Sequence, residues 1–105
     1  MQSSTNSFNQ EIIQNTNSGA TASADFVLSN DVGTNSTFYG NFGMNSSGFT
    51  GSGSFNQPSY VYLTSTSSDL AIGTTTSNGI HFVVNAGTTD AMNITNAGDV
   101  QIPTI

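Results

Sequence analysis

His81 is the only histidine of this sequence and its only side chain that titrates near neutral pH without perturbation. A histidine that acts as a general base needs a nucleophile to activate, and one that binds metal needs further ligands. The sequence has no cysteine and no serine in a Gly-x-Ser-x-Gly motif. In "GIHFVV", His81 alternates with Ile80 and Phe82. We therefore interpret His81 as a partly exposed or hydrogen-bonded histidine of a β-strand.

The carboxylates are the other chemically active groups. Turn aspartates bind Ca²⁺ in some proteins, but the spacing here matches no calcium loop, so capping of turns is the preferred interpretation of Asp31 and Asp99. A glycosidase needs two carboxylates held roughly 5 to 10 Å apart in a cleft. The sequence indicates no such pair, so we predict no catalytic residue, no metal site, no cofactor and no enzymatic activity. The acidic residues are Glu11, Asp25, Asp31, Asp69, Asp90 and Asp99.

Tyrosines are the side chains best suited to a binding function. Neutral sugars are held by aromatic rings together with amide and hydroxyl groups, and this chain is rich in Asn, Ser and Thr. Tyr39, Tyr60 and Tyr62 are therefore candidate contacts for a glycan or a protein partner. Packing in a core or an interface is the more common role of such residues.

The sequence contains no Lys and no Arg, and its formal net charge is -6. Binding to nucleic acid depends on cations that displace counterions from the phosphates, so this class of function is excluded. Anionic membrane surfaces are excluded for the same reason. No apolar run approaches the ~20 residues that a membrane-spanning helix needs.

Apolar residues occur in short alternating runs separated by Gly and Asn clusters, and no segment has the apolar spacing of a helix. Asn78-Gly79 predicts a two-residue turn between strands at 70–74 and 80–84, and a second hairpin is expected around residues 96–99. The sequence thus predicts an all-β protein, an antiparallel β-sandwich or flattened barrel of roughly eight short strands. The expected strands lie around residues 8–14, 24–28, 38–44, 60–66, 70–74, 80–84, 92–94 and 100–102.

One face of each alternating run is expected to form the core. The glycines of "YGNFGMN" indicate that a neighbouring strand approaches closely. The Gly/Ser-rich stretch 46–59 is predicted to be an ordered loop anchored by the rings of Phe49 and Phe55. The predicted core residues are Phe26, Leu28, Phe38, Phe42, Leu70, Ile72, Ile80, Phe82, Val84, Met92 and Ile94.

The composition divides the chain into two parts. Residues 1–22 are expected to form an N-terminal strand and linker, and residues 23–105 a single β-rich module. The total length of 105 residues fits one domain with a modest core.

Several segments of this module resemble a module of tail fibres and other virion-surface proteins of tailed bacteriophages. The resemblance covers about residues 9–105 and is carried by "ADFVLSND", "YGNFGMNSSGF", "DLAIGTTTSNGIHFVVN" and "DAMNIT" followed by "NAGDV". It implies a β-rich structural role on a virion surface or otherwise outside the cell, commonly as a trimer. It offers no catalytic motif to carry over. A short member of that family, or an excerpt of a longer fibre protein, is expected.

Two functions follow as hypotheses. The favoured one is a non-enzymatic structural module that self-associates as a trimer or a repeating assembly and contacts other virion proteins. Lys commonly protects sheet edges from pairing with other chains, and none is present here. The faces opposite the predicted core are expected to carry Val27, Tyr39, either Val61 or Tyr62, and Val83, which also favours association. The alternative is a module that binds host-surface glycans or another host receptor.

Overall fold

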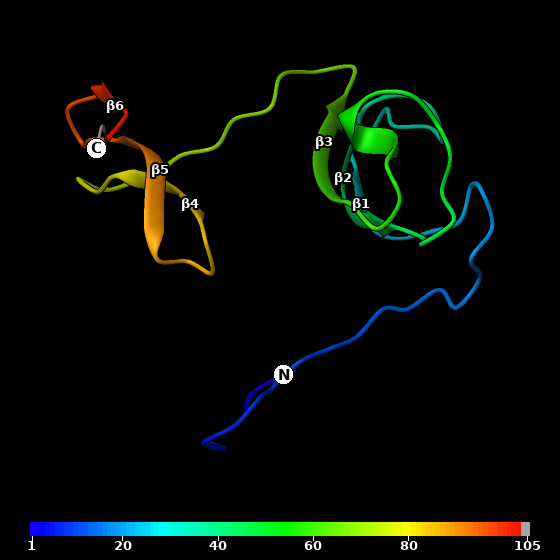
Figure 1. Cartoon of the computed structure of the whole chain (residues 1–105). Coiled ribbons are helices and arrows are strands. Elements are labelled where there is room, and N and C mark those ends of the chain that lie inside the picture. The colour runs from blue at the N-terminus through cyan, green and yellow to red at the C-terminus, as the bar shows by residue number, and fades with distance from the viewer. Residues whose placement is uncertain (104–105) are drawn as a thin grey trace. The chain divides into compact units, whose positions relative to one another are not determined.

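The computed structural model describes residues 1–103, so the last two residues of the predicted 23–105 module lie outside the described part. The chain divides into two compact units, Met1–Leu70 and Ala71–Ile105. Each unit contains one three-stranded antiparallel sheet (Figure 1). The prediction of an all-β antiparallel protein is confirmed. The division between the units falls inside the range predicted as one module.

The first unit is a meander of three strands in which each strand pairs with the next. Its strands are β1 (Ser23–Ser29), β2 (Tyr39–Asn45) and β3 (Val61–Thr66). Phe26 lies opposite Phe42, which in turn lies opposite Leu63. Because side chains alternate along a strand, this register places apolar residues of all three strands on one face. The sequence predicted these three strands.

The two faces of this sheet differ sharply in polarity. We call the first the apolar face; its residues are Ala24, Phe26, Leu28, Gly40, Phe42, Met44, Val61, Leu63 and Ser65. We call the second the polar face; its residues are Ser23, Asp25, Val27, Ser29, Tyr39, Asn41, Gly43, Asn45, Tyr62, Thr64 and Thr66.

The apolar face is open to solvent. Phe26, Leu28 and Phe42 are 59%, 68% and 58% exposed, and no hydrophobic side chain is buried among the described residues. The predicted core is therefore correct in assigning Phe26, Leu28 and Phe42 to one face but wrong in burying them. The sequence pattern predicts which residues share a face. Burial of that face needs a second layer of secondary structure packed on it, and the first unit has only one sheet among its described residues.

The second unit repeats this two-faced design. It consists of β4 (Ile80–Val84), β5 (Thr89–Ile94) and β6 (Val100–Gln101). The hairpin between β5 and β6 is confirmed, and Gly98 has the positive φ (91°) expected at its turn. A register shift between Phe82 and Val83 marks a β-bulge. The predicted core residues Ile80, Phe82, Val84, Met92 and Ile94 share one face of this sheet, and none of them is buried.

Two predicted strands are absent from the described residues. Residues 8–14 and 70–74 have no strand partner, so six strands are seen instead of roughly eight. The Asn78-Gly79 hairpin is wrong because its turn type needs positive φ at both residues, and neither has it. Strand β4 pairs with β5 instead. Backbone pairing joins strands only within each sheet, so the closed barrel is not confirmed.

Phe38, Leu70 and Ile72, the remaining residues of the predicted core, lie outside the strands and are exposed. Phe38 stands just before β2 with a positive φ of 51°. An apolar residue with this backbone conformation belongs to the turn and cannot continue the strand alternation. The sequence pattern alone did not reveal this interruption.

Residues 46–59 form an ordered loop on the first sheet, as predicted, but the anchor differs. The ring of Phe55 is largely exposed and lies in a short 3₁₀ turn, η1 (Ser54–Asn56). Asn45, only 4% exposed, holds this turn instead. Its amide Nδ2 donates to the carbonyl oxygens of Phe55 and Gln57 at 2.9 and 3.0 Å. A buried amide at the end of β2 therefore holds the turn that Phe55 was predicted to anchor, whereas the side chain of Phe49, the other predicted anchor, is half-buried.

We expect Asn45→Asp to lower the free energy of unfolding by about 3 kcal/mol, because a carboxylate would face two carbonyl oxygens in a buried position. Chemical denaturation measures this change. Asn56→Asp is the matched control, since the exposed Asn56 amide also donates to a backbone carbonyl, that of Ser52, at 2.8 Å. Equal losses in the two variants would contradict the role of Asn45.

Candidate functional site

The polar face of the first sheet contains a hydrogen-bonded cluster of Ser23, Asp25 and Tyr62. The hydroxyl of Tyr62 donates to Oδ1 of Asp25, and the hydroxyl of Ser23 donates to Oδ2. Asp25 lies on β1 and Tyr62 on β3, so the cluster bridges the two outer strands across β2. All three side chains are half-buried.

Gly43 of the central strand makes this bridge possible. It pairs with Asp25 on one side and with Tyr62 on the other. A Cβ atom at this position would lie 2.3 Å from Oδ1 of Asp25 and 2.5 Å from the Tyr62 hydroxyl oxygen. The predicted close approach at the glycines of β2 is thus confirmed at Gly43. At Gly40 it is wrong, because a Cβ there would meet nothing nearer than 3.8 Å.

The cluster shifts the titration of both acidic groups. Burial alone raises the pKa of the Asp25 carboxyl, but hydrogen bonds from Ser23, Tyr62 and Asn41 outweigh it and hold this pKa below its ordinary 3.8. Burial raises the pKa of the Tyr62 hydroxyl above its ordinary 10.0, and the hydrogen bond to the Asp25 carboxylate raises it further. Tyr62 is therefore a donor to an ionised Asp25 throughout the neutral range.

The three candidate tyrosines do not form one site. Tyr62 is engaged by Asp25, and Tyr60 lies before β3 with its side chain about half exposed. Tyr39 stands opposite Thr66, four residues along β2 from the Gly43 position that Tyr62 faces, which is about 13 Å. A single ligand contact made by all three rings is thus not supported by the geometry.

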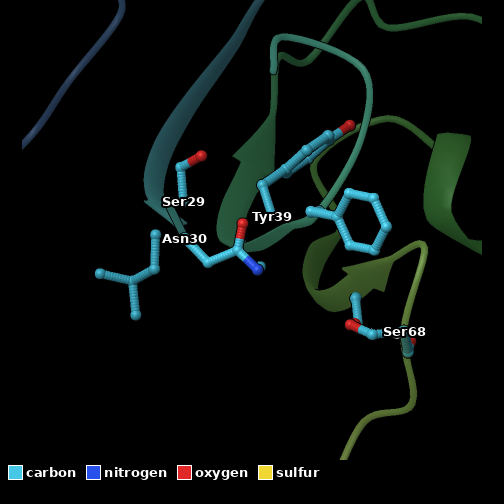
Figure 2. A pocket seen from close by; sticks show the side chains of 8 residues that line it. Ser29, Asn30, Tyr39 and Ser68 are labelled. Atoms are coloured by element: carbon cyan, nitrogen blue, oxygen red, sulfur yellow. Dashed lines mark hydrogen bonds between the residues drawn. The ribbon is translucent and has the colours of Figure 1, made fainter. Parts of the chain in front are cut away.

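Tyr39, without the other two tyrosines, contributes to an open hollow of about 500 Å³ at the end of the first sheet. Figure 2 shows Ser29, Asn30, Tyr39 and Ser68 around it, drawn from the end of β1, the start of β2 and the segment after β3. A second open hollow beside Tyr39 is lined by polar side chains that include Thr34, Asn35 and Asn41. An aromatic ring bordered by amides and hydroxyls is the arrangement expected for weak binding of a neutral sugar.

His81 forms a pair with Asp90 in the second unit. Nδ1 of His81 lies 2.7 Å from Oδ2 of Asp90, and both side chains are substantially exposed. The β-bulge after Phe82 brings Asp90 to the face of β4 that carries His81. The interpretation of His81 as a hydrogen-bonded strand histidine is confirmed. Sequence analysis did not predict its partner, because the bulge that aligns them has no sequence signal here.

The carboxylates otherwise stand apart. Residues 1–103 contain no group of three or more His, Cys, Asp or Glu side chains placed to hold a metal ion. Asp31 was expected to cap a turn, but its neighbour Asn30 caps this turn instead. Oδ1 of Asn30 accepts a hydrogen bond from the backbone N–H of Val32 at 3.0 Å. No helix in the described part of the chain is long and apolar enough to cross a membrane.

Comparison with known proteins adds no relative. No family model matches this chain, and no curated protein matches it. The resemblance to tail-fibre modules therefore stays a prediction from the quoted segments.

Gly43→Ala is expected to separate Asp25 from Tyr62 and to lower the free energy of unfolding by about 1 to 2 kcal/mol, the contribution of hydrogen bonds to a charged group. Thermal or chemical denaturation measures the loss. Gly40→Ala is the control on the same strand and should be neutral, because a Cβ at Gly40 has room. A neutral Gly43→Ala would show that the cluster adds nothing to stability.

The titration shifts predict a stability that falls at both extremes of pH. The lowered pKa of Asp25 contributes stability above pH 3.8 that is lost as the pH falls through its folded value. The raised pKa of Tyr62 contributes stability below pH 10.0 that is lost as the pH rises through its folded value. Melting temperatures measured against pH should lose the acidic decline in Asp25→Asn and the alkaline decline in Tyr62→Phe. Unchanged profiles in both variants would refute the coupling.

Proposed function

We propose that this chain is a non-enzymatic structural module that builds a β-rich homo-oligomer, as a trimer or a repeating assembly, in a tail fibre or another virion-surface structure. Its other partners would be neighbouring virion proteins. The uncovered apolar face of the first sheet is the observation that carries the proposal. The resemblance of the quoted segments to tail-fibre modules supplies the biological setting.

The described part of the chain has no buried hydrophobic core. Folding must offset a conformational entropy cost of about 1 to 2 kcal/mol per residue, mainly by burying apolar surface. No hydrophobic side chain is buried among residues 1–103, and the large side chains of the apolar face remain about half exposed. Covering each of these side chains would contribute about 1 to 2 kcal/mol. A partner surface is therefore the most direct source of the missing stability.

Charge favours a second copy of the same chain as that partner. Every residue of the apolar face is uncharged, and Asp25, the one charged residue of the sheet, lies on the polar face. The residues of the apolar face thus bring no carboxylate of the sheet into such a contact. Glu11 of the N-terminal stretch lines a hollow on this face together with Met44 and Val61. Among residues 1–103, no strand pairs with the outer edges of β1 and β3, and the sequence has no Lys to keep other strands away from them.

A glycan-binding role is the second candidate, and the Tyr39 hollows are the observation that favours it. A glycan array with the parent and Tyr39→Ala would test it. Binding that disappears in Tyr39→Ala but persists in Tyr60→Ala would support this role. Tyr60 is the matched control because it lies outside both hollows.

Light scattering and native mass spectrometry test the structural role. We expect the parent to have a mass that is a multiple of 10.9 kDa and Leu63→Asp to shift it toward the monomer, because a carboxylate on the apolar face opposes burial. Thr64→Asp adds the same charge at the next position of β3, on the polar face, and should leave the mass unchanged. A monomeric parent at micromolar concentration would exclude the proposal.

A further inference from the structure

The N-terminal stretch has the composition of a strand but pairs with no strand among residues 1–103. Residues 8–14 are extended and belong to no strand or helix (blue in Figure 1). Side chains two residues apart lie on the same side of an extended chain, so Phe8 and Ile12 share one side of this stretch. They are 86% and 74% exposed. Glu11, the one charged side chain of the stretch, alternates with them along the chain and, with Ile13, lines a hollow on the sheet of its own chain.

The same stretch leads to the apolar face. Ile13 lines a hollow of about 350 Å³ together with Phe42, Met44 and Val61 of that face. The amide of Asn15 donates to the carbonyl oxygen of Ser23 at 3.0 Å, which ties the stretch to the start of β1. Residues 8–12 therefore extend from the border of the apolar face, and their apolar side chains, Phe8 and Ile12, remain exposed.

The size of the apolar face shows why these side chains matter. β1 and β2 have seven residues each and β3 has six, so at a strand spacing of about 4.8 Å the face has a footprint of roughly 330 Å². A stable protein interface buries about 800 Å² on each partner. The face is thus small for a stable interface, and further apolar surface from residues 8–13 would enlarge the contact.

We propose that residues 8–13 of one copy pack across the apolar face of a second copy, with Phe8 and Ile12 against its phenylalanines and leucines. This inference rests on the proposed self-association and identifies the segment that completes it. The six residues 8–13 span about 20 Å when extended, against about 24 Å for the seven residues of β1, so the segment covers most of the length of one sheet. The exposure of Phe8 and Ile12 within a single chain favours a second copy over the segment's own sheet.

Cross-linking tests this arrangement cleanly, because the chain contains no cysteine. Gln10→Cys places a thiol between Phe8 and Ile12, and Ser65→Cys places one on the apolar face of β3. The two single variants, one of them labelled with ¹⁵N, are unfolded, mixed, refolded and treated with a short bismaleimide. We expect linked peptides of one heavy and one light chain at a yield several-fold above that of Gln10→Cys with Thr64→Cys, its control on the polar face.

Each outcome has a distinct meaning. In one outcome, light scattering shows that the protein is oligomeric while Ser65→Cys and Thr64→Cys give equal yields. That result would overturn the docking of residues 8–13 but leave the proposed self-association intact. A monomeric parent would overturn the proposed function as well. The Gln10→Cys/Ser65→Cys double variant is also cross-linked at high dilution. A link within one chain would show that the segment folds onto its own sheet, which would overturn its docking on a second copy.

A second measurement does not depend on cross-linking. Phe8→Ser combined with Ile12→Ser should raise the apparent dissociation constant of the oligomer at least tenfold, while Asn9→Ser, on the other side of the stretch, should leave it unchanged. Unchanged dissociation in the Phe8→Ser/Ile12→Ser variant would contradict the docking of this segment.

Discussion

Antiparallel backbone pairing is the interaction on which the first unit depends. β1, β2 and β3 are joined residue by residue, whereas no hydrophobic side chain is buried in the described part of the chain. A hydrogen-bonded ladder fixes register but contributes little net free energy, because water competes for the same groups. Small sheets need a covered apolar face for independent stability. The isolated chain therefore has a defined strand register but lacks the free energy that burial of its apolar face would contribute.

The polar face partly compensates for this deficit. Asp25 and Tyr62 connect the outer strands above Gly43, and Asn45 ties the long loop to the end of β2. The Tyr62 ring and the Asp25 carboxylate fit closely above Gly43, where a Cβ atom would leave no room for them. The result reverses the usual arrangement of a globular protein, since the polar face is the more covered one. That reversal is typical of a subunit whose apolar face belongs to an interface.

The absence of Lys and Arg has consequences at every level. Asp25 has no cation to pair with, so hydroxyls and an amide provide its hydrogen bonds. The sheet edges have no cationic side chain to hinder the approach of another strand. Both features agree with a chain that contacts further copies of itself through neutral surfaces, which is the role we propose.

Alternation and turn residues are local properties, so they were enough to predict the fold class, β1 to β3, the closing hairpin and most of the residues that share a strand face. Phe38 was the exception, because its positive φ interrupts the alternation before β2. The sequence did not reveal that residues 8–14 and 70–74 lack partners, since pairing needs a matching strand elsewhere in the chain. Tertiary structure alone joined Tyr62 to Asp25, brought Asp90 to His81 through a bulge and gave Asn45 its anchoring role. Strand register decides such contacts, and register depends on residues far apart in the sequence.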